Sequence, residues 1–178
     1  MNSAKIMAIV GSLRKDSVNR MIAEAAMASA GDGVGFNIVD LGDVPVYNGD
    51  LEAAGVPDSV SDLHEQMAAA DGLLIFSPEY NGSFPAVTKN AIDWLSRPPQ
   101  SWEGKAIALV VASPGPRGGV SVRTHFETIM EYLPVRLFES MGIGMYGDKI
   151  ADGELVDPVT RTELADYVRR FGEFAIEK

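Results

Sequence analysis

An α/β fold around a central parallel sheet is the fold class that the sequence predicts. Three observations indicate it: short continuous apolar runs recur along the chain, segments with helical spacing of apolar residues separate them, and Gly- and Pro-rich loops connect the two. Strands of a buried parallel sheet are apolar on both faces, and each crossover between them is usually a helix. The 178 residues suffice for one such domain with a sizeable core.

The first half of the chain alternates between strand-like and helix-like segments. Apolar runs predict strands at 6–10, 36–41 and 73–76. Apolar residues at helical spacing predict helices whose buried faces span 18–25, 60–70 and 87–95. The adjacent prolines 98 and 99 end the third of these helices.

The second half continues the alternation to the end of the chain. Residues 106–112 form the longest apolar run and predict a fourth strand, and Val135–Phe138 predict a fifth. Helical spacing recurs at 122–133 and 164–175. Asp157 precedes Pro158 and is expected to cap the last helix.

Five strand–helix units restrict the topology to a few arrangements, because crossovers between parallel strands are right-handed. The order 2-1-3-4-5, with helices on both faces of the sheet, suits five strands. We therefore expect a three-layer sandwich over residues 1–178 as a single domain. The stretches 42–58 and 142–158 are expected to be longer surface connections.

Composition excludes several classes of function. The chain has no cysteine, which excludes disulfides and thiolate-held metal or iron–sulfur sites, and His64 and His125 are its only histidines. We expect both histidines to lie at the surface or at a partner contact, and Trp94 and Trp102 to be packing residues. The net charge of −10 argues against nucleic-acid or anionic-membrane partners. No apolar run approaches the roughly 18 residues of a membrane helix, and a cytoplasmic location is expected.

The loop after the first strand, residues 11–20, is rich in basic and hydroxyl side chains. It holds three of the five basic residues in the first half of the chain. Free amides at the start of the next helix and the guanidinium of Arg14 favour an anion here, and Ser12, Ser17 and Asn19 add short polar side chains. The loop therefore predicts a phosphate cradle, although it lacks the lysine motif of triphosphate loops. A helix simply capped by Ser17 is the alternative, and the two roles are compatible.

The loops after the third and fourth strands have unusual compositions as well. Residues 77–85 contain two prolines, Tyr80 and an Asn81-Gly82 pair that favours a turn with positive φ. Such a stiff loop, with backbone amides and an aromatic, suits a flat heteroaromatic ligand, whereas a tight turn with one packed aromatic is the plainer interpretation. Residues 113–119 are mostly Gly and Pro, so their backbone can approach a ligand closely. Ligands of open α/β sheets bind beyond the carboxyl ends of the strands, where all three loops are expected to meet.

Two of these segments resemble the signatures of the NADPH-dependent FMN reductase family, in the branch of chromate, quinone and azo reductases. They are GSLRKDSVNR at 11–20 and SPEYNGSFPAVTKNAIDWLSRP at 77–98. The rest of the chain matches the family more loosely in order and length. The third loop departs from the family pattern at Pro114, Pro116 and Arg117.

The resemblance implies a flavodoxin-like fold and an FMN site whose residues fall into three groups. The FMN phosphate would be held by Ser12, Arg14, Ser17 and Asn19. The isoalloxazine and ribityl chain would be lined by Pro78, Glu79, Tyr80, Asn81 and Gly82. The other side of the ring would be closed by Ser113, Gly115 and Gly118. NADPH or NADH would be the co-substrate, and the assembly a homodimer or homotetramer.

The expected reaction is hydride transfer from the nicotinamide to FMN and onward reduction of a quinone, chromate, azo compound or ferric chelate. The cofactor carries this chemistry, so we expect no catalytic acid, base or nucleophile from the protein and no metal. Two other functions fit the same loops: a flavodoxin-like electron carrier or redox sensor without turnover, and a nucleotide-binding protein without flavin.

Overall fold

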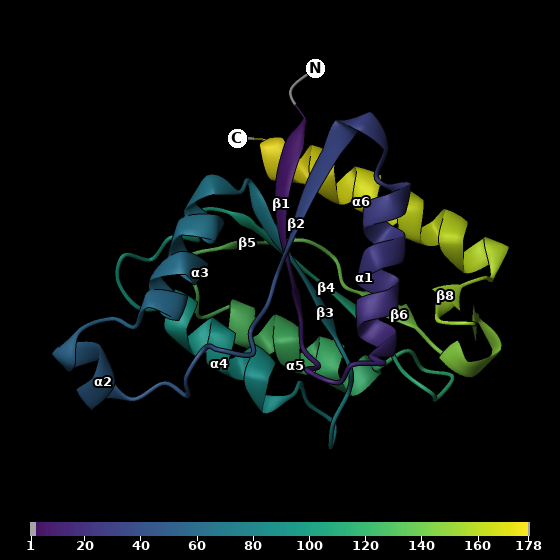
Figure 1. The fold of residues 1–178 in the computed structure, drawn as a ribbon. Helices are drawn as coiled ribbons and strands as arrows, with labels where there is room; N and C mark the ends of the chain where they lie inside the picture. Colours follow the sequence, from purple (N-terminus) through teal and green to yellow (C-terminus); the bar gives the residue numbers. More distant parts are fainter. Residues whose placement is uncertain (1–2, 178) are drawn as a thin grey trace.

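A parallel β-sheet forms the centre of the protein. The computed structural model describes residues 3–177. The sheet order is β2-β1-β3-β4-β5, which confirms the predicted topology. The strands on this path are β1 (Ala4–Val10), β2 (Val34–Val39), β3 (Gly72–Ser77), β4 (Ala106–Ala112) and β5 (Arg136–Leu137). In Figure 1, β1 runs downward from the N-terminus, so the carboxyl ends of the strands lie at the bottom of the view.

The fifth position differs from the prediction because two short strands share it. Residues 136–137 pair with the first residues of β4, and β6 (Met141–Ile143) pairs with its last three. The expected strand 135–138 therefore covers only the first of them. Glu139 and Ser140 leave the sheet between them, and the Glu139 carbonyl instead accepts a hydrogen bond of 2.7 Å from the Tyr167 hydroxyl.

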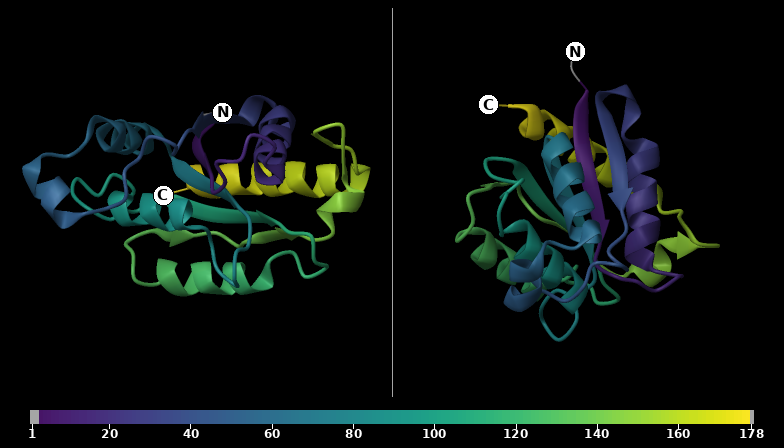
Figure 2. Two further views of the ribbon diagram at one scale, coloured as in Figure 1. Left: turned by 60° about the horizontal axis from the view of Figure 1, so that its bottom comes forward. Right: turned by 60° about the vertical axis from the view of Figure 1, so that its left-hand side comes forward.

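Helices cover both faces of the sheet, as Figures 1 and 2 show. One face is covered by α1 (Val18–Ser29) and α6 (Pro158–Ile176). The other is covered by α3 (Asp58–Ala69), α4 (Ala86–Leu95) and α5 (Val120–Met130). Side chains of a strand point to alternate faces. In β1, Ile6 and Ala8 accordingly belong to the first core and Met7 and Ile9 to the second.

The two stretches expected as plain connections contain short regular elements. Helix α2 (Gly49–Ala54) lies in the first, and the hairpin of β7 (Ile150–Ala151) and β8 (Glu154–Leu155) lies in the second. Two 3₁₀ turns, η1 (Gly31–Gly33) and η2 (Tyr146–Asp148), complete the elements. The side chain of Asn48 caps α2 by accepting a 2.8 Å hydrogen bond from the amide of Asp50. No helix within residues 3–177 has the length and apolarity needed to cross a bilayer.

The location predicted for His64 is wrong, whereas those predicted for the tryptophans are confirmed. His64 is only 4 % exposed, and its Nδ1 lies 2.9 Å from the Ser101 hydroxyl, with which it shares a hydrogen bond. Position 64 belongs to the buried stripe of α3, together with Val60, Leu63 and Met67. Burial lowers the pKa of this imidazole. Trp94 and Trp102 are fully buried in the core.

Candidate functional site

Three loops meet at the carboxyl-end edge of the sheet, as the sequence predicts. They leave β1, β3 and β4, which are consecutive in the sheet, so the loop after β3 lies between the other two. We call them loop one (11–17), loop two (78–85) and loop three (113–119). Adjacent strands are about 4.8 Å apart, so the strands before loops one and three are separated by roughly 10 Å.

Loop one presents unpaired backbone amides. The amide of Gly11 donates to the carbonyl of Phe76 at 2.7 Å, but the amides of residues 12–17 donate to no acceptor in the described part of the chain. The hydroxyl of Ser12 likewise has no partner among residues 3–177, and Arg14 is exposed beside it. Together these groups form a concentration of hydrogen-bond donors at the start of α1, where an anion is also favoured by the helix dipole.

Close packing explains the glycine that opens loop one. A Cβ at Gly11 would lie 2.2 Å from Oγ1 of Thr88 and 2.9 Å from Oγ of Ser77, so no larger residue fits. Thr88, on the first turn of α4, is fully buried, and its hydroxyl is unpaired within the described chain. Thr88 is not among the residues predicted for the site, because nothing in its local pattern shows that α4 packs beneath loop one.

Ser17 and Asn19 each perform a structural role inside the predicted cradle. The Ser17 hydroxyl accepts a long, 3.4 Å hydrogen bond from the amide of Arg20. Ser17 therefore caps α1, which is the alternative that the sequence left open for it. The Oδ1 of Asn19 accepts a 3.0 Å hydrogen bond from the amide of Ala112 at the end of β4. The hydroxyl proton of Ser17 and the amide nitrogen of Asn19 remain available as donors.

Loop two folds into a tight hairpin at the predicted turn. Tyr80 and Ser83 exchange two backbone hydrogen bonds, of 2.8 and 3.0 Å, around Asn81 and Gly82, whose φ angles are 53° and 75°. Positive φ at both central positions is the pattern that favours Asn-Gly. The turn projects from the sheet edge, and the side chain of Tyr80 is 47 % exposed there.

Contacts with α5 hold both ends of loop two. The carboxylate of Glu79 accepts a 3.1 Å hydrogen bond from the amide of Val122 in the first turn of α5. At the other end, Ser83 Oγ and His125 Nδ1 are 2.8 Å apart, and the His125 ring stacks on Phe84 with a centroid distance of 5.1 Å. This anchoring leaves no local signal in the sequence, because each pair joins residues about 40 positions apart.

Loop three is packed tightly against β6 and the residue that follows it, Gly144. A Cβ at Gly118, whose φ is +55°, would lie 2.7 Å from the carbonyl carbon of Gly142. The Ser113 hydroxyl donates to the carbonyl of Gly115 at 3.2 Å, whereas the space above Gly115 is open. A hollow of about 280 Å³ lies beside this loop and is lined by its residues together with Glu79 and Val120.

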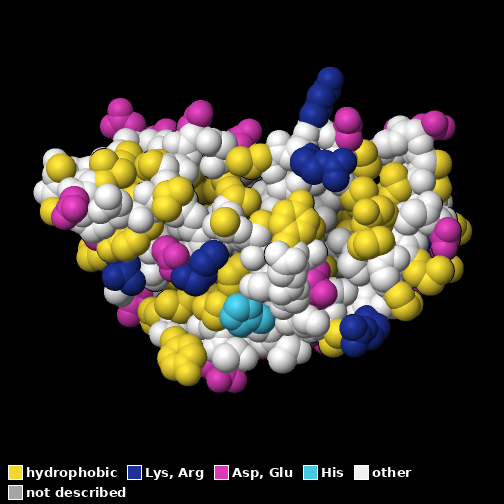
Figure 3. Space-filling view, turned by 90° about the horizontal axis from the view of Figure 1, so that it is seen from below, with side chains coloured by type: hydrophobic (Ala, Val, Ile, Leu, Met, Phe, Trp, Pro, Cys, Tyr) yellow, Lys and Arg dark blue, Asp and Glu magenta, His cyan; other side chains and the backbone are white. Residues whose placement is uncertain are grey.

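Positive charge at this edge is dispersed. Figure 3 looks onto the edge from below and shows Lys and Arg side chains at separate places, with hydrophobic side chains and a histidine between them. Neither Arg14 on loop one nor Arg117 on loop three makes a salt bridge with any residue in 3–177. In a chain of net charge −10, these guanidiniums provide local sites for anions.

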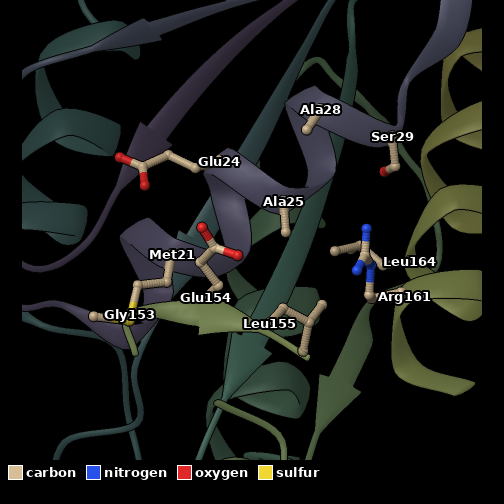
Figure 4. A pocket seen from close by; sticks show the side chains of 10 residues that line it. All are labelled: Met21, Glu24, Ala25, Ala28, Ser29, Gly153, Glu154, Leu155, Arg161 and Leu164. Carbon is tan, nitrogen blue, oxygen red and sulfur yellow. The ribbon is translucent and has the colours of Figure 1, made fainter. Parts of the chain in front are cut away.

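A second hollow, of about 350 Å³, lies away from this edge. It is enclosed by α1, α6 and the β7–β8 hairpin, and Figure 4 shows Arg161 and Glu154 approaching it from different elements. None of the residues predicted for the site lines this hollow. No group of three or more potential His, Asp or Glu metal ligands is found within residues 3–177.

Comparisons with known proteins show to which family the chain is similar. A family model described as NADPH-dependent FMN reductase matches residues 4–142. A 2-hydroxy-1,4-benzoquinone reductase of Burkholderia sp is 35 % identical, over 98 % of this chain and 97 % of that protein. A quinone reductase of Escherichia coli (strain K12) is 36 % identical, over 96 % and 94 %. Among solved structures, the flavoenzyme NAD(P)H:(acceptor) oxidoreductase FerB from Paracoccus denitrificans matches with a TM-score of 0.85 and 32 % identity, over 97 % of each chain.

Proposed function

The chain belongs to the NADPH-dependent FMN reductase family, and on that premise we propose that it uses bound FMN to pass electrons from a nicotinamide nucleotide to a quinone. The protein is thus an NAD(P)H-dependent flavin oxidoreductase. The observation that supports the assignment of its site is the set of unpaired amides in loop one, next to an exposed guanidinium and two further loops at the same edge.

Loop one fits the phosphate of FMN. A phosphate monoester carries about −1.5 to −2 charges at neutral pH and three strong acceptor oxygens, by analogy with phosphorylated side chains. The free amides of residues 12–17 provide directed donors, and Arg14 provides a planar fork that matches two oxygens. The remaining donors that we assign to the phosphate are the side chains of Ser12, Ser17 and Asn19.

Loops two and three fit the flat part of the cofactor. Between Pro78 and Gly82, loop two is held by its turn and by the hydrogen bond that Glu79 accepts from α5. It therefore presents a fixed surface. On the other side, the open space above Gly115 lets a planar ring approach the backbone of loop three. Ser113 and Gly118 complete this side, Gly118 by letting the loop approach Gly142.

When held by the three loops, FMN would supply the chemistry of hydride acceptance from the nicotinamide and of electron transfer to the second substrate. The role of the chain's own residues would be to bind and orient the reactants, and we assign to the backbone donors of loop two the stabilisation of negative charge on the ring. Quinones are the acceptor class that we propose, since two relatives are named for them. Chromate, azo compounds and ferric chelates are further candidates, and a homodimer or homotetramer is the assembly that we propose.

Anaerobic stopped-flow spectroscopy tests this function. The FMN-loaded protein is mixed with NADPH or NADH, and then with 1,4-benzoquinone. We expect rapid bleaching of the flavin absorbance followed by its return with the quinone. Absence of bleaching with both nucleotides would instead support an electron carrier, and failure to retain or bind FMN would support a nucleotide-binding protein without flavin.

A further inference from the structure

The carboxyl-end edge carries an exposed guanidinium in loop three as well as the one in loop one, and neither forms an ion pair within residues 3–177. Arg14 belongs to loop one and Arg117 to loop three, and loop two lies between them. The strands that lead into these loops are separated by two strand spacings, or roughly 10 Å. FMN has a single phosphate, and the donors of loop one account for it, so Arg117 is left to bind a different anion.

The backbone around Arg117 is fixed although its side chain is exposed. Pro114 and Pro116 restrict the chain before it. After it, the close approach of Gly118 to Gly142 prevents the loop from shifting inward. The loop is also tied to the segment after β6 by the amide of Met145, which donates to the carbonyl of Gly115 at 3.1 Å. A guanidinium carried on a braced loop loses less conformational freedom when it binds than one on a mobile loop.

No carboxylate within residues 3–177 forms an ion pair with Arg117. The carboxylate that lines the same hollow belongs to Glu79, and that group accepts a hydrogen bond from the amide of Val122. No ion pair joins the two side chains. The guanidinium therefore borders a hollow of about 280 Å³ with its charge unpaired.

We propose that Arg117 binds a phosphate group of the nicotinamide nucleotide and so contributes to the recognition of that substrate. This inference rests on the proposed function, because it presupposes that NAD(P)H enters beside loop three. The nucleotide brings several negative charges to a protein of net charge −10, so a local cation is needed to offset repulsion. The planar fork of Arg matches phosphate oxygens in geometry as well as charge.

Stopped-flow reduction of the FMN-loaded protein tests the proposal in Arg117→Ala and Arg117→Lys variants. We expect the apparent dissociation constant of the nicotinamide nucleotide to rise roughly tenfold in Arg117→Ala, the scale of one charge-assisted hydrogen bond. The increase should be smaller in Arg117→Lys, which keeps the charge and loses the fork. The limiting rate of flavin reduction and the dissociation constant of FMN should both stay within about twofold of wild type. A rise for NADPH alone identifies the 2′-phosphate as the contact, and a rise for NADPH and NADH alike identifies the pyrophosphate.

Arg161→Ala is the matched control, because it removes an exposed guanidinium of equal charge from the hollow of Figure 4 and should leave all these constants unchanged. Unchanged affinity for both nucleotides in Arg117→Ala would overturn the proposal while leaving the reductase assignment intact. Weakened FMN binding, or an equal loss in Arg161→Ala, would overturn it as well. If the wild-type protein itself is not reduced by either nucleotide, it is the proposed function that fails.

Discussion

The two edges of the sheet use their polar groups in opposite ways. At the amino-end edge, cationic side chains are bonded to carbonyls at the ends of helices. Nζ of Lys105 donates to the carbonyls of Met67, Ala68 and Ala70, at 2.8, 2.6 and 2.5 Å, and so covers the end of α3. The guanidinium of Arg136 donates to Gly104 and, near the end of α6, to Phe174 and Ala175.

At the carboxyl-end edge, by contrast, several donors have no partner within residues 3–177. The amides of residues 12–17 in loop one are free, and Arg14 and Arg117 are unpaired within residues 3–177. Helix carbonyls without partners reduce stability, and cations placed on them restore it. Free donors at a helix start are equally unsatisfied, but an external anion can satisfy them. We therefore expect substitutions at the amino-end edge to lower the free energy of unfolding, and substitutions at the carboxyl-end edge to weaken ligand binding.

The largest effect is expected at the binding edge, in Arg14→Ala. Removing a charge-assisted contact to the FMN phosphate should weaken FMN binding by about 1.5–3 kcal/mol, or roughly 10- to 150-fold. The free energy of unfolding without FMN should change by less than about 0.5 kcal/mol, because Arg14 is exposed and unpaired. Fluorescence titration with FMN and urea denaturation measure the two quantities. Retention of wild-type FMN affinity would contradict the assignment of loop one.

The opposite pattern is expected in Lys105→Met. This change leaves three carbonyls without their donor and should lower the free energy of unfolding by about 2 kcal/mol, with FMN affinity unchanged. Urea denaturation measures the loss. Lys5→Met removes an exposed lysine of the same edge and serves as the control, with an expected change below about 0.5 kcal/mol. Equal stability of the two variants would show that the bonds of Lys105 contribute nothing.

Glu79 lies where binding and folding overlap, and a pair of variants separates the two. Glu79→Ala removes the acceptor for the Val122 amide and should cost about 1 kcal/mol of stability, as the loss of a helix cap does. Glu79→Gln keeps an oxygen acceptor there and should lose less than half as much. Thermal denaturation of the FMN-free proteins measures both. If Glu79→Gln is as unstable as Glu79→Ala, the charge and not the hydrogen bond holds loop two.

The smallest expected effect is a change in how the free energy of unfolding depends on pH. We expect it at His64, which is buried and is not among the residues assigned to the FMN site. Burial holds the pKa of His64 below its ordinary value of 6.5. As pH falls below 6.5, the unfolded chain takes up this proton before the folded protein does, so stability declines until the lowered folded pKa is reached. His64→Gln should lose less stability than wild type between pH 7 and pH 5 in urea denaturation. Identical declines in the two proteins would exclude His64 as the cause.

Strand order and the meeting of the three loops could be predicted from the sequence. Continuous apolar runs mark buried strands such as 106–112, and right-handed crossovers then leave few ways to arrange them. The turn at Asn81 and Gly82 was predictable because its conformation is set by those two residues. Each of these features depends on local composition or on a general rule of topology.

Features that depend on distant partners could not be predicted. The hydrogen bond of His64 depends on Ser101, and the anchoring of loop two depends on His125 in α5. Thr88 lies under loop one only because α4 packs there. The split of the fifth strand into β5 and β6 has no local sequence signal. It depends on which short segment pairs with each half of β4.

A crystal structure of the protein with FMN is the most direct test of the difference between the two edges. The account predicts the phosphate among the amides of residues 12–17 with Arg14 beside it, and the ring between loops two and three. FMN bound in the hollow of Figure 4, or at the amino-end edge near Lys105, would contradict it.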